Sequence, residues 1–194
     1  MRSKTAYKIC VSGAAAGECL AKPIRLKAEA LGRAIAKSGA ILTHGATTGL
    51  PHEAAKGAKQ AHGLVFGFSP ASTRGEHMRK YRLPINFADA IIYTGAGYAG
   101  RNLILTRSSD AVIVVCGRIG TLNEFTVAYE DKKVIGILRA SGGITSELED
   151  ILRIAKRGRQ NIIFDSDPED LVRKVIQGIR VIERKHLSTT QDNA

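Results

Sequence analysis

The chain has 194 residues, a length that suits one domain, and its 44% hydrophobic and 24% charged residues are ordinary for a globular protein. No run of about 18 apolar residues predicts a membrane span, and the first residues lack the apolar stretch of a signal peptide, so a cytoplasmic protein is expected. The net charge of +11 favours an anionic partner. Because no aromatic residues alternate with the basic ones, that partner is not expected to be nucleic acid.

In the first half of the chain, apolar runs alternate with segments of helical periodicity. In chain order they predict a strand at Tyr7–Ser12, a helix at Ile24–Lys37, a strand at Ala40–Thr43, a helix at Pro51–Ala61 and a strand at Gly63–Phe68. The polar segment 69–86 shows no periodicity and predicts a mobile loop with one turn at most. This loop carries a basic cluster formed by Arg74, Arg79, Lys80 and Arg82.

The second half of the chain continues the alternation. It predicts a strand at Ala88–Thr94, a helix at Gly100–Ser108, a strand at Asp110–Val115, a helix at Thr121–Glu130, a strand at Val134–Leu138, a helix at Ser146–Lys156, a strand at Asn161–Phe164 and a last helix from Pro168. A capping box is expected at Ser146 and Glu149, and an N-cap at Asp167. The predicted strand Asp110–Val115 is continuously apolar after its first residue, which is typical of a strand covered on both faces.

This order predicts the fold class. Repeated strand–helix units indicate an α/β, Rossmann-like, three-layer, doubly wound parallel sheet of about seven strands in a single domain. The domain is expected to span residues 1–186, followed by a disordered tail at 187–194.

The three cysteines, Cys10, Cys19 and Cys116, are an odd count at long spacings. Such a pattern is typical neither of a disulfide framework nor of a zinc site, so buried thiols in a reduced compartment are predicted. The sequence also lacks a Walker A element, an HExxH motif and a GxSxG elbow. No metal ion and no cofactor is therefore expected.

Four of the predicted strands end in glycine-rich loops. The loops are Ser12–Gly17, His44–Leu50, Gly95–Asn102 and Gly117–Thr121. Glycine lets the backbone approach a ligand closely, and a helix N-terminus behind such a loop offers free N–H groups to a phosphate. Since the carboxyl ends of parallel strands meet at one edge of the sheet, the four loops predict one anion-binding site there.

The third loop, Gly95–Gly100, is also a literal G-x-G-x-x-G between a strand and a helix, which is compatible with a dinucleotide site. The dinucleotide fingerprint needs an acidic residue about 20 positions later, where this chain has Cys116, Gly117 and Arg118. Because an arginine can accommodate a 2′-phosphate, an NADP-binding protein is kept as an alternative. The NADP alternative does not explain the other three glycine loops.

The segment Gly100–Glu124 resembles the signature of the Lonely Guy (LOG) family, once described as lysine decarboxylases, in a wider superfamily of Rossmann-like nucleotide-binding proteins. That signature is an arginine opening a helix, an apolar strand and then P-G-G-x-G-T-x-x-E, and Gly45–Leu50 is similar to the family's G-G-x-x-x-G-L element. In this chain Cys116-Gly117-Arg118 replaces P-G-G, and Ala99–Asn102 replaces H-E-R-K. The Gly-Arg-Asn form looks closer to the branch that includes molybdenum-cofactor carrier proteins.

The resemblance implies an activity and a set of site residues. LOG enzymes hydrolyse the N-glycosidic bond of a nucleoside 5′-monophosphate and release the free base and ribose 5-phosphate, and Arg101 and Glu124 match their catalytic residues. A carboxylate at this position suits an oxocarbenium-like transition state. The residues expected to bind the phosphate or nucleotide are Ser12, Gly13, Gly45, Thr48, Gly97, Gly117, Arg118, Gly120 and Thr121.

Several alternatives stay open at this point. The altered loop favours a non-catalytic carrier or sensor of a nucleotide or a molybdenum-cofactor pterin, and Thr121-x-x-Glu124 also matches an ordinary capping box. His44 and His52 are interpreted as structural or solvent-facing, and Tyr98 either stacks on a base or packs within the protein. The expected partners are a small phosphorylated nucleotide or pterin ligand and, from the resemblance, a second copy in a homodimer.

Overall fold

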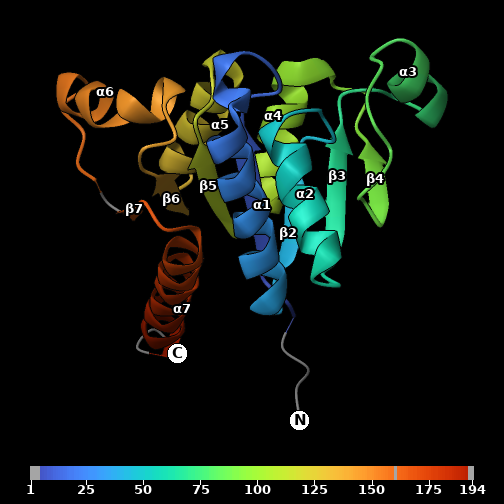
Figure 1. Cartoon of the computed structure of the whole chain (residues 1–194). Coiled ribbons are helices and arrows are strands. Elements are labelled where there is room, and N and C mark those ends of the chain that lie inside the picture. The colour runs from blue at the N-terminus through green and yellow to red at the C-terminus, as the bar shows by residue number, and fades with distance from the viewer. Residues whose placement is uncertain (1–4, 160, 192–194) are drawn as a thin grey trace.

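The computed structural model describes residues 5–159 and 161–191. Within these residues seven strands form one sheet, in which every neighbouring pair is parallel and the order is β4-β3-β2-β1-β5-β6-β7 (Figure 1). The strands are β1 (Lys8–Gly13), β2 (Ile41–His44), β3 (Val65–Ser69), β4 (Ala90–Tyr93), β5 (Ala111–Val115), β6 (Val134–Leu138) and β7 (Ile162–Asp165). The order reverses between β1 and β5, which is the switch point of an open α/β sheet.

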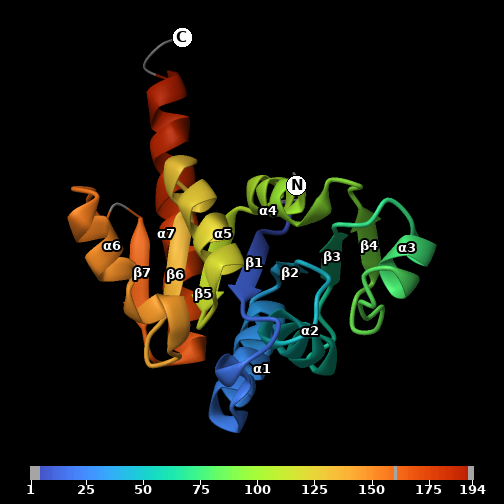
Figure 2. The same cartoon turned by 90° about the horizontal axis from the view of Figure 1, so that it is seen from above.

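Helices cover both faces of the sheet, which makes three layers. They are α1 (Lys22–Lys37), α2 (Leu50–Gln60), α3 (Arg74–Arg79), α4 (Gly97–Ser108), α5 (Ile119–Glu130), α6 (Leu148–Ile154) and α7 (Pro168–Gln191), with short 3₁₀ turns η1 (Glu18–Leu20) and η2 (Gly143–Ser146). Figure 2 shows α1 and α2 on one side of the sheet and α4 and α5 on the other. The predicted single Rossmann-like domain with a parallel sheet is confirmed.

The side chains of the central strand β5 pack into the apolar clusters on both faces of the sheet. All five of its residues are buried, as its continuous apolar sequence predicts. Ile113 and Val115 pack into the cluster formed with α1, α2 and α7, whereas Val112 and Val114 pack into the cluster formed with α4, α5 and α6. Each valine or isoleucine side chain that β5 buries contributes about 1.5–3 kcal/mol of hydrophobic stabilisation.

The basic segment 69–86 contains the ordered helix α3. Thr73 caps this helix, because its hydroxyl accepts a hydrogen bond from the Glu76 N–H at 3.1 Å. The buried His77 fixes the segment further: one ring nitrogen lies 2.8 Å from Ser69 Oγ and the other 2.9 Å from the Pro84 carbonyl oxygen. These contacts lie within the segment itself and order it, so the prediction of a mobile loop is wrong here.

The C-terminal third differs from the sequence-based expectation in two places. The helix α7 continues to Gln191, past Leu187 where a disordered tail was expected, and residues 192–194 lie outside the described residues. The expected capping box at Ser146 does not form; α6 begins at Leu148, and Glu149 pairs with Arg139 instead. The predicted N-cap of α7 is confirmed, since the Asp170 N–H donates to Asp167 Oδ1 at 2.9 Å.

Among the described residues no helix is long and apolar enough to cross a membrane, the 24 residues of α7 included.

Candidate functional site

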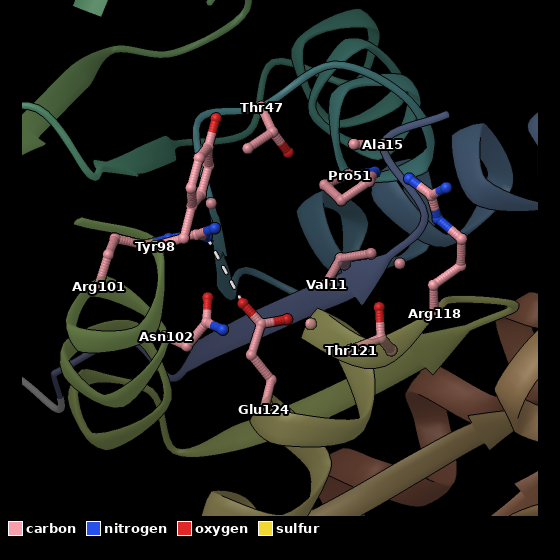
Figure 3. A pocket seen from close by; sticks show the side chains of 13 residues that line it. Val11, Ala15, Thr47, Pro51, Tyr98, Arg101, Asn102, Arg118, Thr121 and Glu124 are labelled. Carbon is pink, nitrogen blue, oxygen red and sulfur yellow. Dashed lines mark hydrogen bonds and ion pairs between the residues drawn. The ribbon is translucent and has the colours of Figure 1, made fainter. Parts of the chain in front are cut away.

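A cavity of about 150 Å³ opens at the carboxyl ends of the strands, beside the switch point between β1 and β5. All four glycine-rich loops contribute to its wall. The lining residues are Val11, Gly13, Ala15, Gly45, Thr47, Pro51, Tyr98, Arg101, Asn102, Arg118, Gly120, Thr121 and Glu124 (Figure 3). We call this space the site cavity.

The first two loops are tied to each other by backbone contacts. The Leu50 N–H donates to the Ala14 carbonyl oxygen at 2.9 Å, and the Thr48 hydroxyl donates to the Ala15 carbonyl oxygen at 3.1 Å. Gly49 has φ of +79°, and a Cβ there would lie 2.3 Å from the Ala14 oxygen. Only glycine therefore lets the two loops approach this closely.

The loop before α5 provides free backbone donors. The N–H groups of Ile119, Gly120 and Thr121 belong to the first turn of this 12-residue helix, where no intrahelical acceptor exists. The positive end of the helix dipole lies at the same place. The N-terminus of α2 offers less, because Leu50 N is already bonded and Pro51 has no N–H. Of these two helix N-termini, that of α5 therefore offers more free donors to a phosphate.

Arg101 and Glu124 face each other across one wall of the cavity, and both side chains are more than nine-tenths buried. Arg101 Nη1 lies 3.5 Å from Glu124 Oε1, and the Ser12 hydroxyl donates a hydrogen bond to Glu124 Oε2. Burial raises the pKa of the Glu124 carboxyl, while the Arg101 charge and the Ser12 hydrogen bond lower it. Arg101 Nε is buried and makes no hydrogen bond within the described residues.

The start of α5 decides between the two interpretations of Glu124. A capping box would need Thr121 at the N-cap, but the helix begins at Ile119 with Arg118 as its N-cap, and no side chain caps it. Glu124 therefore lies within the helix and points to Arg101 (Figure 3), and the Ser12 hydroxyl donates to its other carboxylate oxygen. Its position is not that of a capping residue.

The helices α4 and α5 are fixed to each other next to this pair. Asn102 Nδ2 donates to Asn123 Oδ1 at 3.0 Å, and Asn102 itself lines the cavity. This contact holds the relative position of the helices that carry Arg101 and Glu124.

Most of the predicted site residues come together in the cavity, and four do not line it. Those on the wall are Gly13, Gly45, Arg101, Arg118, Gly120, Thr121 and Glu124. Ser12 lies behind the wall, on Glu124. Thr48 and Gly97 are replaced on the wall by their neighbours Thr47 and Tyr98, and Gly117 supports the loop at φ of +93°.

Sequence reasoning missed Val11, Ala15, Thr47, Pro51 and Asn102 as lining residues. Only Asn102 had a signal that could have identified it, as a member of the Gly-Arg-Asn element. Tyr98 lines the rim and is 50% exposed, with the Tyr81 ring edge-on to it at 5.5 Å. Of the two interpretations of Tyr98, this position favours a ring that is open to a ligand.

His44 lies at the end of β2, directly before Gly45, and does not line the cavity. It is 2% exposed, neither ring nitrogen has a hydrogen-bond partner in the described part of the chain, and burial lowers its pKa to about 3. It is therefore a neutral core residue, in agreement with its structural interpretation.

The prediction of three buried thiols is wrong for two of them. Cys19 and Cys116 form a disulfide across a sequence separation of 97 residues, and Cys10 is free and buried. The disulfide joins the loop after β1 to the loop after β5. It also lines a second cavity of about 410 Å³, together with Ala16, Gly17, Glu18, Gly117, Arg118, Ser141, Gly142 and Gly143.

The G-x-G-x-x-G loop is badly placed for a dinucleotide. It follows β4, which is the edge strand of the sheet, and its third glycine lies inside α4. The dinucleotide fingerprint belongs to the first strand–helix turn, beside the switch point. This position disfavours the NADP alternative.

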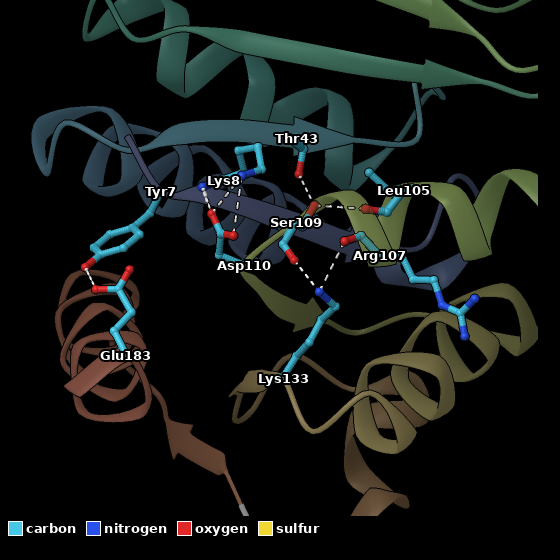
Figure 4. Close-up of polar contacts among 9 residues, drawn as sticks. All are labelled: Tyr7, Lys8, Thr43, Leu105, Arg107, Ser109, Asp110, Lys133 and Glu183. Carbon is cyan, nitrogen blue, oxygen red and sulfur yellow. Dashed lines mark hydrogen bonds and ion pairs between the residues drawn. The ribbon is translucent and has the colours of Figure 1, made fainter. Parts of the chain in front are cut away.

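Near the amino ends of β1, β5 and β6, polar side chains form hydrogen bonds with one another and with the backbone (Figure 4). The Lys8 N–H donates to Asp110 Oδ2 at 2.7 Å, Thr43 and Ser109 hydroxyls lie 2.7 Å apart, and Lys133 Nζ donates to the Ser109 carbonyl oxygen at 2.5 Å. We interpret these contacts as structural. Within the described ranges, no group of three or more His, Cys, Asp or Glu side chains is arranged to hold a metal ion.

A doubly wound sheet with a loop-lined cavity at its switch point defines the chain as a Rossmann-like α/β protein. More specifically, it belongs to the SLOG cluster4 family, whose sequence model matches residues 6–172. An uncharacterised protein of Archaeoglobus fulgidus is 39% identical over 124 residues, which cover 64% of this chain and 76% of that protein.

Two solved structures are similar in both fold and sequence. The molybdenum cofactor carrier protein of Chlamydomonas reinhardtii is 26% identical with a TM-score of 0.73, and the match covers 91% of this chain and 99% of that one. The molybdenum cofactor binding protein of Rippkaea orientalis is 30% identical with a TM-score of 0.71, covering 93% and 99%. The predicted position near the molybdenum-cofactor-carrier branch is thus confirmed.

Proposed function

We propose that this chain binds a phosphorylated nucleotide- or pterin-type ligand in the site cavity and hydrolyses the N-glycosidic bond of a nucleoside 5′-monophosphate there. The observation that carries the proposal is the meeting of Arg101 and Glu124 with the free N–H groups of α5 on the wall of one cavity. The cavity thus offers one small ligand a positive charge, free N–H donors and a carboxylate.

The phosphate is assigned to the first turn of α5, where Gly120 and Thr121 offer N–H groups and Thr121 adds a hydroxyl. Arg101 Nε, buried and unpaired within the described residues, is a donor for an oxygen atom of the ligand. The exposed ring of Tyr98 at the rim suits a planar base. These three contacts order the ligand from phosphate to ring.

The reaction is the attack of water on the anomeric carbon: a C–O bond forms, the C–N bond to the base breaks, and the proton that the water loses ends on the departing base. The ionised Glu124 carboxylate stabilises the positive charge that develops on the sugar or takes a proton from the attacking water. Arg101 holds the carboxylate and the ligand through charged hydrogen bonds, and Ser12 fixes the second carboxylate oxygen.

Chromatographic detection of released base tests the reaction. Purified protein is incubated with a panel of nucleoside 5′-monophosphates, and Glu124→Gln is compared with Glu130→Gln, a substitution at the far end of the same helix. We expect release by the wild type and Glu130→Gln and a loss of at least a hundredfold in Glu124→Gln. Release that survives Glu124→Gln would remove the proposed reaction.

A second candidate function is that of a non-catalytic carrier of a pterin or nucleotide. The similarity to the two molybdenum cofactor proteins favours it, as does Arg118 in place of the second glycine of P-G-G. A ligand that raises the melting temperature and is recovered intact, with no base released by the wild type, supports this candidate.

A homodimer is part of the proposal. Ile92 on the edge strand β4, and Leu103 and Ile104 on α4, are apolar side chains exposed by 37–42%. We expect light scattering to give twice the chain mass, and Leu103→Glu to halve it. The matched substitution Ile154→Glu on α6 is expected to leave the mass unchanged.

A further inference from the structure

The site cavity is too small for the whole of a nucleotide-sized ligand. Its volume of about 150 Å³ is below the roughly 300–1,000 Å³ of typical ligand pockets. A ligand anchored on α5 must therefore extend past the wall of the cavity. The second cavity, of about 410 Å³, lies in one of the available directions.

Two observations place the second cavity next to the first. Arg118 lines both, and the adjacent residues Ala15 and Ala16 line the first and the second respectively. In Figure 3 the Arg118 side chain extends from the loop before α5 toward the loop that carries Ala15. A Cβ built on Gly17 would lie 4.0 Å from Arg118 Nη1, so the guanidinium lies beside the loop after β1.

Arg118 is an exposed cation that makes no ion pair or side-chain hydrogen bond with the described residues. A guanidinium presents several N–H donors in one plane and matches phosphate oxygens with two parallel hydrogen bonds. The α5 amides and Arg118 thus offer two successive anion contacts along one path. Two linked phosphates match this arrangement better than one.

The far part of the second cavity has a different chemistry. Four of the residues on its wall are glycines, and Glu18 is the acidic residue among the others. A carboxylate repels a further phosphate but accepts hydrogen bonds from hydroxyl groups. An uncharged group with hydroxyls therefore suits this part of the wall better than a further anion.

We infer that the ligand of this chain carries a pyrophosphate. Its first phosphate lies on α5 and its second on Arg118, and a hydroxylated group such as a sugar continues into the second cavity. The inference rests on the proposed function, because it takes the 5′-phosphate of the nucleoside to bind at α5. It extends the ligand from a nucleoside 5′-monophosphate to a pyrophosphate ester that contains this monophosphate as its first half.

Titration calorimetry with inorganic phosphate, pyrophosphate and tripolyphosphate at constant ionic strength tests the inference without knowledge of the base. We expect pyrophosphate to bind at least about tenfold more tightly than phosphate, because Arg118 adds charged hydrogen bonds. Tripolyphosphate is expected to bind no more tightly than pyrophosphate, because its third phosphate approaches Glu18.

Three variants distinguish a specific contact of Arg118 with the second phosphate from a general effect of positive charge on affinity. Arg118→Gln is expected to bring the affinities for pyrophosphate and phosphate to within about threefold of each other. Ala16→Leu, which fills the second cavity, is expected to lower the affinity for adenosine diphosphate ribose by at least about tenfold and to leave that for phosphate unchanged. Arg153→Gln, an exposed arginine on α6, is expected to behave like the wild type.

The outcomes are distinguishable. Equal binding of phosphate and pyrophosphate by the wild type, a preference that persists in Arg118→Gln, or a further gain with tripolyphosphate overturns this inference and leaves the proposed function standing. Failure of all phosphate compounds to bind, nucleotides included, overturns the proposed function and the inference together.

Discussion

Gly45 leaves the space that the Arg101 guanidinium fills: a Cβ built on Gly45 would lie 1.7 Å from Arg101 Nη1. The backbone of Gly45 does not require a positive φ, so the side chain of Arg101, not the turn, demands a glycine here. The loop after β2 therefore lies in close contact with the Arg101 side chain of α4 at the site.

The substitution Gly45→Ala should displace Arg101 from Glu124. We expect a loss of ligand affinity of at least about tenfold and a loss of roughly 1–3 kcal/mol in the free energy of unfolding, because the new methyl group overpacks a buried site. Gly158→Ala, at a glycine with nothing within 4 Å, is the control and should change neither quantity.

A double-mutant cycle checks the cause. In an Arg101→Ala background the side chain that meets the new methyl group is absent, so Gly45→Ala should cost much less than it does in the wild type. Additive effects on the free energy of unfolding would contradict the proposed contact.

Ser12 should control the pKa of Glu124. Its hydrogen bond to Glu124 Oε2 stabilises the ionised carboxylate, whose pKa burial raises. In Ser12→Ala the pKa should therefore rise further, and base release, which needs the ionised form, should require a higher pH. Carbon-13 NMR of labelled glutamate carboxyls measures this pKa independently of activity; Ser146→Ala is the matched control, and an unchanged or lower pKa in Ser12→Ala argues against the contact.

His44 should make the fold sensitive to acid. Its pKa is about 3 in the folded chain and about 6.5 when unfolded, so between these values the unfolded chain binds more protons. Stability from this group is full above pH 6.5 and decreases by up to about 1.4 kcal/mol per pH unit as the pH falls toward 3.

Urea unfolding at pH 7.5 and pH 5 measures this effect. His44→Leu should reduce the difference in stability between the two pH values by about 1–2 kcal/mol, because leucine does not titrate. His62→Asn is the control, since His62 is exposed and asparagine tolerates its positive φ of 57°. An unchanged pH dependence in His44→Leu would mean that His44 is not neutral in the folded chain.

The disulfide should stabilise the chain substantially. It links residues 97 positions apart, and closing a loop of that size lowers the entropy of the unfolded chain, which adds about 4–5 kcal/mol to the free energy of unfolding at about 25 °C. Unfolding of the double variant Cys19→Ser/Cys116→Ser should show a loss of up to this size. Thiol titration of the denatured wild type should find one free thiol before reduction and three after it; three before reduction would exclude the disulfide.

The fold was predictable because its signals are local. The alternation of periods 2 and 3.6, and above all the apolar run that became β5, predicted the parallel sheet and its single domain. That four glycine loops share one edge followed from the parallel order alone.

What the sequence could not predict depends on contacts between distant segments. The pairing of Cys19 with Cys116 arises because the parallel sheet brings the ends of β1 and β5 together, and no spacing rule reports it. Thr47 lines the cavity, whereas the Thr48 hydroxyl donates to the Ala15 carbonyl oxygen, a contact between two loops that are distant in the sequence. Ser12 gave no signal of its contact with Glu124, because the two lie 112 residues apart.

The most direct test of the central claim is a crystal structure of the protein with a nucleoside 5′-monophosphate at saturating concentration. The account predicts the phosphate within hydrogen-bond distance of the Gly120 and Thr121 N–H groups, and the sugar or its ribose 5-phosphate product between Arg101 and Glu124. A ligand bound elsewhere on the chain, or a site that stays empty at saturation, would contradict it.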